Sequence, residues 1–146
     1  MGVICPCGVK VNAKKEKQNV IFKGGCGTVT GNLTYLANVC VTTLASSTLS
    51  LKFEDTMTSG KFSFLFTANT ITSVTCKKEG QNCVVTVQGT GKIGLKEYAF
   101  EAKFKDQGSL ASYDIVQSFV IDGFFNQNGV IPVAQGSIVA LGCQKL

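Results

Sequence analysis

Seven cysteines are the most reactive side chains of this 146-residue sequence. Cysteines at this density are typical of proteins that fold in, or are exported to, an oxidising compartment, where their thiols form disulfides. Cys76 and Cys83 flank the turn sequence KKEGQN, and the segments on either side have strand-like composition. We therefore expect a hairpin whose two strands are joined by an intramolecular Cys76–Cys83 disulfide.

The other five cysteines are an odd number, so at least one of them is free or bonded to another chain. Two lie near the N-terminus, one lies in the turn GGCG, and one follows the last predicted strand. We predict that these four form inter-subunit disulfides: Cys5, Cys7, Cys26 and Cys143. Cys40 lies in an apolar segment, which favours a small buried residue with a free thiol.

The segment Cys5-Pro6-Cys7-Gly8 has two alternatives to a disulfide, which are free thiols and a soft metal ion. A tetrahedral zinc site takes four ligands, usually from spaced pairs of residues. The sequence has no C-x2-C pair and no histidine. We therefore expect neither a metal nor a cofactor.

Catalysis is not expected either. Histidine is the commonest general acid or base, and its absence excludes the usual Ser-His-Asp and Cys-His systems. Two carboxylates facing one cleft could still hydrolyse a glycoside. Acids that end strands and enter turns more often cap backbone N–H groups, however. On this basis the chain is predicted not to be an enzyme, and the acids weighed are Glu54, Asp55, Asp106, Asp114 and Asp122.

The cysteines and acids named above must be positioned by strands, which the sequence indicates by alternating apolar and polar residues. Residues 49–54, 61–67 and 98–105 alternate apolar with polar residues, and a period of two places each apolar set on one face of a sheet. Turn sequences rich in Gly, Asn and Ser separate about nine or ten such segments, and no amphipathic helix of ten residues is present. The pattern predicts an all-β fold, a single antiparallel β-sandwich or jelly roll.

The sequence divides into an extended N-terminal arm over residues 1–19 and a β-sandwich domain over residues 20–146. The net charge of +5 comes entirely from lysine, because the sequence contains no arginine. Sequence-specific readers of nucleic acid depend on arginine, so we expect no nucleic-acid partner. No segment approaches the roughly 20 apolar residues that cross a bilayer, so we expect no membrane span.

Short motifs from about residue 31 to residue 139 follow a recognisable order. They are Gly31-Asn32-Leu33-Thr34-Tyr35, Ile71-Thr72-Ser73-Val74, residues 85–91, residues 98–102 leading to Asp106, Asp114, Phe119-Val120-Ile121 and residues 136–139. This order resembles an accessory β-sandwich domain of secreted and surface-associated bacterial proteins, which implies no catalytic residues. The cysteine-bearing N-terminal segment is also similar to that of endospore appendage subunits, small jelly-roll proteins joined by disulfides through an N-terminal connector.

These features predict a structural subunit of an extracellular or spore-surface filament. Its partner would be the chain itself, in a head-to-tail homopolymer joined by the arm, through inter-subunit disulfides or by adding as a strand to a neighbour's sheet. The alternative is a monomeric secreted binding module for carbohydrate or another surface ligand. Such a module needs a concave patch with exposed aromatic side chains, for which the candidates are Tyr35, Tyr113, Phe124 and Phe125.

Overall fold

The computed structural model describes residues 5–23, 28–108 and 111–142, and most of these residues lie in β-strands. The all-β class predicted from the sequence is therefore confirmed. The strands are β1 (Gly8–Phe22), β2 (Thr28–Cys40), β3 (Thr48–Asp55), β4 (Phe64–Glu79), β5 (Asn82–Ile93), β6 (Lys96–Asp106), β7 (Tyr113–Ile121), β8 (Phe125–Asn126), β9 (Ile131–Ala134) and β10 (Ile138–Leu141). A short 3-10 helix, η1 (Val41–Ser46), connects β2 to β3. Within the described ranges, no helix has the length and apolar character needed to cross a membrane.

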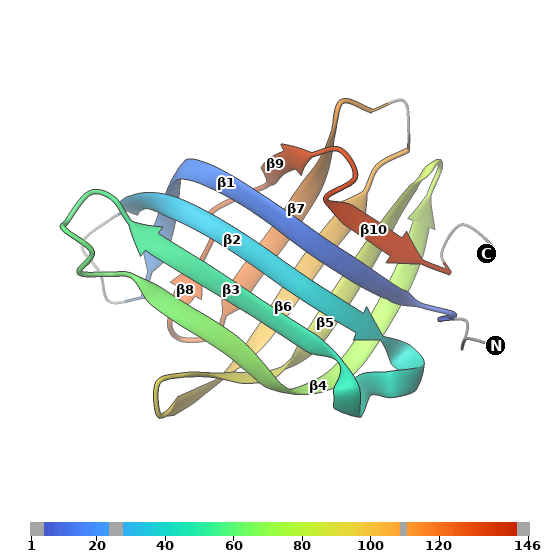
Figure 1. The fold of residues 1–146 in the computed structure, drawn as a ribbon, viewed down its shortest axis with the longest axis horizontal. Coiled ribbons are helices and arrows are strands. Elements are labelled where there is room, and N and C mark those ends of the chain that lie inside the picture. The colour runs from blue at the N-terminus through green and yellow to red at the C-terminus, as the bar shows by residue number, and fades with distance from the viewer. Residues whose placement is uncertain (1–4, 24–27, 109–110, 143–146) are drawn as a thin grey trace.

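The strands form one antiparallel sheet that closes on itself as an eight-stranded barrel (Figure 1). Each strand from β1 to β7 pairs with the next one along the chain. The three short strands share the eighth position, because β8 pairs with both β7 and β1, β9 pairs with β7, and β10 pairs with β1. The predicted β-sandwich or jelly roll is therefore wrong. A sandwich has two separate sheets, whereas here β8 joins the two ends of a single one.

The sheet bends sharply where β4 passes β5. Two β-bulges interrupt their pairing within residues 68–73 of β4, and bulges increase the local bend and twist of a strand. Opposite them, a Cβ on Gly89 would overlap the carbonyl oxygen of Thr70, and one on Gly91 would overlap the Phe66 ring. Glycine thus permits the close approach that the bend requires. As a result, β1 to β3 run in one direction in Figure 1 and β5 to β7 lie behind them in another.

The segment expected to be an N-terminal arm supplies most of β1. From Gly8 onward it pairs with β2 on one side and β10 on the other. Val9, Val11 and Ala13 point inward and are buried in the core. The predicted division into an arm over 1–19 and a domain over 20–146 is therefore wrong for residues 8–19. Polar residues alternate with these three apolar ones, because the outer face of β1 is in contact with solvent.

Aromatic side chains fill the interior of the barrel. The Phe66 and Phe119 rings, for example, lie with their centroids 6.2 Å apart in an edge-to-face arrangement. One polar pair lies among them. The Tyr35 hydroxyl donates to Gln127 Oε1 at 2.8 Å, and Gln127 Nε2 donates to the Val116 carbonyl at 2.9 Å. Burial raises the pKa of Tyr35, so this hydroxyl stays a neutral donor.

Candidate functional site

Two disulfides tie the start of β1 to neighbouring strands. Cys5 bonds to Cys40, the last residue of β2, and Cys7 bonds to Cys76 in β4; the Cα atoms of each pair are 5.9 Å apart. The two bonds lie at the same end of the barrel, because the register places Cys40 beside Gly8, one residue after Cys7. They connect positions 35 and 69 residues apart in the sequence, and so constrain the unfolded chain strongly.

These bonds correct three of the cysteine predictions. Cys5 and Cys7 were expected to bond to neighbouring subunits, but each bonds within its own chain. Cys40 was expected to be a buried free thiol, but it is bonded to Cys5. The error follows from predicting an N-terminal arm. Because β1 is a strand of the barrel, the two cysteines just before it lie next to β2 and β4. Cys26 and Cys143 lie outside the described residues, so their inter-subunit bonds remain predictions.

The predicted Cys76–Cys83 bond is also wrong. The two residues do lie on the two strands of the expected hairpin, β4 and β5. The register of that hairpin, however, pairs Cys83 with Lys78 and pairs Cys76 with Val85. Cys76 is bonded to Cys7 instead, and Cys83 belongs to a different disulfide.

Asp114 is a fully buried carboxylate in β7 that organises the neighbouring turns. Its Oδ1 accepts a hydrogen bond from the Gln107 backbone N–H at 2.9 Å. Its Oδ2 accepts from the N–H groups of Gly136 at 2.9 Å and Ile138 at 3.1 Å. One side chain therefore joins the end of β6 to the turn between β9 and β10.

Asp106 lies close to Asp114, at the end of β6. Its Oδ2 accepts a hydrogen bond from the Ala140 backbone N–H at 2.8 Å. Partial burial raises the pKa of Asp106, and the charge of Asp114 raises it further, against the opposing effect of the hydrogen bond from Ala140. Both carboxylates accept hydrogen bonds from backbone N–H groups, which is the role that the sequence predicted for Asp106 at the end of its strand.

The opposite end of the barrel carries a cluster of aromatic rings. Phe124, between β7 and β8, packs against Phe64, Tyr98 and Phe22 with ring centroids 5.1, 5.3 and 5.5 Å away. Phe62, in the turn between β3 and β4, lies 5.4 Å from Phe22. We call these five residues the mouth cluster. Three of its members, Phe62, Tyr98 and Phe124, are only partly buried.

A hollow of about 330 Å³ opens at the mouth cluster. Its apolar wall comes from four phenylalanines and one isoleucine, and its polar lining from two lysines and one serine. The residues are Phe22, Phe62, Phe64, Phe124, Ile93, Lys23, Lys61 and Ser63. Lys61 Nζ lies 5.7 Å from the centroid of the Phe62 ring, within the range of a cation–π contact. The hollow thus combines aromatic faces with positive charge.

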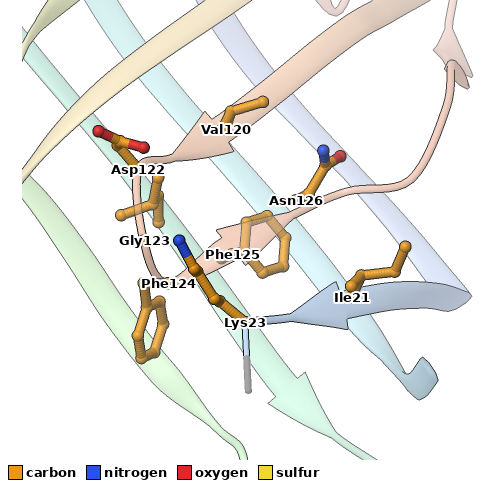
Figure 2. Close-up of a pocket in the computed structure, with 9 residues that line it drawn as sticks. Ile21, Lys23, Val120, Asp122, Gly123, Phe124, Phe125 and Asn126 are labelled. Atoms are coloured by element: carbon orange, nitrogen blue, oxygen red, sulfur yellow. The ribbon is translucent and has the colours of Figure 1, made fainter. Parts of the chain in front are cut away.

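A second hollow of about 300 Å³ adjoins the first, over the connection between β7 and β8. Lys23 and Phe124 line both hollows. Figure 2 shows the Lys23 side chain extending from the end of β1 toward this connection, with Asp122 and Asn126 at separate positions around the hollow. The Lys23 backbone N–H donates to the Phe124 carbonyl at 3.0 Å, which holds the end of β1 against the ring that separates the two hollows.

Asp55 fixes the turn that carries Phe62. Its Oδ1 accepts hydrogen bonds from the N–H groups of Met57 at 2.8 Å and Thr58 at 2.9 Å. Its Oδ2 accepts from the Phe62 N–H at 3.1 Å and from the Thr58 hydroxyl. Desolvation raises the pKa of Asp55, but these hydrogen bonds together outweigh it and lower the pKa to about 2. The side chain therefore remains an ionised acceptor that shapes one wall of the hollow.

This geometry predicts that acid loosens the turn at the mouth. A carboxyl whose folded pKa lies below its unfolded value stabilises the fold above the unfolded pKa, here 3.8, and loses that effect as the pH falls toward about 2. The stability difference between the wild type and Asp55→Asn should be largest at neutral pH and shrink between about pH 4 and pH 2. Thermal unfolding of both proteins across this range measures it. A difference that does not change with pH would contradict the assignment.

The four aromatic residues proposed from the sequence as ligand contacts differ in burial and in position. Tyr35 is fully buried, and Tyr113 is 45 % exposed at the end of β7 away from Phe124. Phe125 is almost completely buried, although it forms part of the lining of the second hollow. Phe124 alone is partly exposed and lines both hollows.

Of the residues that line the first hollow, sequence reasoning proposed only Phe124 as a ligand contact, and those it missed include Lys23, Lys61 and Phe62. The alternation over residues 61–67 indicated a strand, but β4 begins at Phe64, and Lys61 and Phe62 belong to the preceding turn. The run Ser-Gly-Lys-Phe was the available signal, because glycine marks a turn, and turns lie on the surface and often carry binding residues.

The fold and the site together define an antiparallel β-barrel. Disulfides link its strands at one end, and the hollow at the other end is lined by aromatic rings and two lysines. Across the described ranges, no three His, Cys, Asp or Glu residues form a group that could hold a metal ion. Comparison with protein-family models, with curated proteins and with solved structures found no match. The resemblances stated from the sequence therefore remain predictions, except that the sandwich fold they implied is wrong.

Proposed function

We propose that this chain is a non-enzymatic binding module of an oxidising extracellular compartment, at a cell or spore surface, which takes a small ligand into the mouth of the barrel. The observation that carries the proposal is the hollow beside the partly buried ring of Phe124. Aromatic-lined concave sites with a few convergent polar groups are typical of small-ligand binding, and barrel mouths are a common place for them.

Two features of the barrel support this function. Among the described residues, the interior beneath the hollow is packed with side chains, so a ligand bound at the mouth would not pass through the barrel. The walls of the hollow come from β1, the β3–β4 turn, β4, β5 and the β7–β8 connection, which the closed sheet holds in fixed relative positions. A preformed site of this kind needs little ordering when its ligand binds.

The Cys5–Cys40 and Cys7–Cys76 disulfides support the oxidising location. Cytosolic thiols are kept reduced in most organisms, whereas disulfides persist in secreted and surface proteins. Both bonds lie away from the mouth cluster and leave the hollow unobstructed.

Fluorescence titration with N-phenyl-1-naphthylamine, an uncharged aromatic probe, tests the proposed binding site. We expect one saturable site per chain in the wild type. Phe124→Ala removes a ring that lines both hollows and should weaken binding about tenfold, in line with the loss of one partly buried aromatic contact.

Tyr113→Ala is the matched control, because it removes an exposed aromatic side chain elsewhere on β7 and should leave the probe affinity unchanged. Phe62→Ala alters the mouth from a different turn and should reproduce the effect of Phe124→Ala. Near-UV circular dichroism verifies that each variant is folded. No saturable binding, or equal affinities for the wild type and both mouth variants, would reject the proposal.

The structural subunit of a filament remains a prediction. Its joint can no longer rest on Cys5 and Cys7, so it would depend on Cys26, Cys143 or non-covalent contacts between chains. Seven cysteines still leave at least one without an intramolecular partner. Non-reducing electrophoresis and negative-stain microscopy of the oxidised protein test this function. Disulfide-linked oligomers or filaments would support it, and a monomer in both measurements would reject it.

A further inference from the structure

We infer that the mouth of the barrel selects small planar aromatic anions, such as aromatic carboxylates or sulfonates. This inference rests on the proposed function and specifies the chemistry of its ligand. Three observations carry it: the shape of the apolar wall, the sign of the charges around it, and the fixed position of the residues that bear those charges.

The wall favours flat rings. Phe22 meets Phe64 and Phe124 with their ring planes at 89° and 85°, so the rings present both faces and edges to the hollow. Aromatic pairs prefer edge-to-face and offset-stacked arrangements, which a planar ligand can extend and a branched aliphatic one cannot. A volume of about 330 Å³ lies at the lower end of the range for ligand pockets, which suits a ligand of one to three rings.

The charges favour an anion. The eight residues that line the first hollow include Lys23 and Lys61 and no acid. Both lysines are exposed, and they approach from different elements, the end of β1 and the β3–β4 turn. The nearest acid of that turn, Asp55, already accepts four hydrogen bonds, which disperse its charge. The overall charge of +5 adds a weaker attraction for anions at longer range.

The lining of the second hollow indicates where in the mouth an anion would bind. Asp122 is part of its lining and would repel an anion placed there. Lys23 lies between the two hollows and can pair with a ligand in the first. The acidic group of the ligand is therefore expected to lie between Lys23 and Lys61, with its ring against Phe62 and Phe124.

The backbone near both lysines is already fixed. The Lys23 N–H donates to the Phe124 carbonyl, and the Lys61 N–H donates to the Thr58 carbonyl at 3.2 Å. Phe62, next to Lys61, is held by its hydrogen bond to Asp55 at 3.1 Å. Among the described residues that line the hollow, the exposed lysine side chains are the groups that must become ordered when an anion binds, which limits the entropic cost of binding.

Two probes that share one ring skeleton test the inference. 8-Anilinonaphthalene-1-sulfonate differs from N-phenyl-1-naphthylamine by a single sulfonate. At low salt, replacing both lysines in Lys23→Gln/Lys61→Gln should weaken binding of the sulfonate about tenfold, the combined effect of two exposed ion pairs, and leave the uncharged probe unaffected. Raising the ionic strength should reduce the sulfonate's affinity for the wild type in the same direction.

Lys10→Gln/Lys14→Gln is the matched control. It removes the same charge from the exposed outer face of β1, at positions that do not line the hollow, and should change neither affinity. Competition extends the test to carboxylates, because 2-naphthoate should displace the sulfonate probe at a lower concentration than 2-naphthamide does.

The possible outcomes separate the inference from the proposed function. Equal weakening of both probes by the double lysine variant, or of the sulfonate alone by the control variant, would overturn anion selectivity. A Phe124→Ala protein that binds both probes as the wild type does would reject the mouth as the binding site. Selective loss of the sulfonate in Lys23→Gln/Lys61→Gln, with loss of both probes in Phe124→Ala, would support both.

Discussion

Replacing Cys7 and Cys76 together with serine is expected to lower the free energy of unfolding by about 4 kcal/mol. The bond joins residues that are 69 positions apart, and releasing a loop of that length adds much conformational entropy to the unfolded chain. Small domains are stable by only about 5–15 kcal/mol, so this loss is a large share of the total. Chemical denaturation of the oxidised wild type and of Cys7→Ser/Cys76→Ser measures the difference.

The companion variant Cys5→Ser/Cys40→Ser provides an internal scale. Its bond joins residues 35 positions apart, and the shorter loop should make its loss about half a kcal/mol smaller. A Cys7→Ser/Cys76→Ser protein as stable as the wild type would mean that the bond does not form in solution. Peptide mapping of the oxidised protein by mass spectrometry provides an independent check of both pairings.

Removal of the Asp114 carboxylate should have a comparably large effect. In Asp114→Ala, three backbone N–H groups, those of Gln107, Gly136 and Ile138, lose their acceptor in or near the core. Each buried donor without a partner costs about 1–3 kcal/mol, so a loss of about 3 kcal/mol or more is expected. Denaturation measures the total, and amide hydrogen exchange at Gly136 and Ile138 should accelerate more than exchange elsewhere in the barrel.

Asp106→Asn is the matched control for Asp114→Ala. The pKa of Asp106 is raised in the folded state, so its ionised form destabilises the fold at pH values above that pKa, and the penalty disappears as the pH falls through it. Asparagine keeps an oxygen acceptor for the Ala140 N–H and carries no charge. The variant should therefore be at least as stable as the wild type at pH 7 and lose this advantage in acid. A loss as large as that of Asp114→Ala would contradict this explanation.

The strands of this fold were predictable from the sequence, but their closure was not. Alternation such as that of residues 98–105 shows which face of a strand is buried. Both a sandwich and a barrel bury one face of each strand, so alternation cannot distinguish them. The deciding contact is the short pairing of Ile21 and Phe22 with β8, which local patterns do not reveal.

The first strand was not predicted because it is rich in lysine. Residues 8–15 alternate inward and outward facing residues, yet Lys10, Lys14 and Lys15 made the segment resemble a solvated arm. From that error followed the wrong cysteine pairing, because the partners of Cys5 and Cys7 depend on where β1 lies. The sequence did contain a signal for Asp114, since it shares the inward face of β7 with Val116. A polar residue on an inward face must find partners, and its partners come from distant turns.

The candidate site was only partly predictable for a similar reason. Phe124 was identified from its aromatic character, but its neighbours Phe22 and Phe62 come from strands and turns far away in the sequence. The hollow exists because the barrel brings together the end of β1, the β3–β4 turn and the β7–β8 connection. Neither the composition nor the spacing of residues predicts that these three segments come together.

The pairing partners of β1 also constrain how the polypeptide acquires its structure during synthesis. On one edge β1 meets β2, its immediate successor, but on the other it meets β8 and β10, which the ribosome makes much later, near the end of the sequence. Until those strands emerge, that edge stays open to pairing with other nascent chains. Cys40 and Cys76 are both synthesised before β8 and β10, so oxidation can anchor β1 before closure. Compartments rich in thiol oxidants should therefore favour correct folding over aggregation.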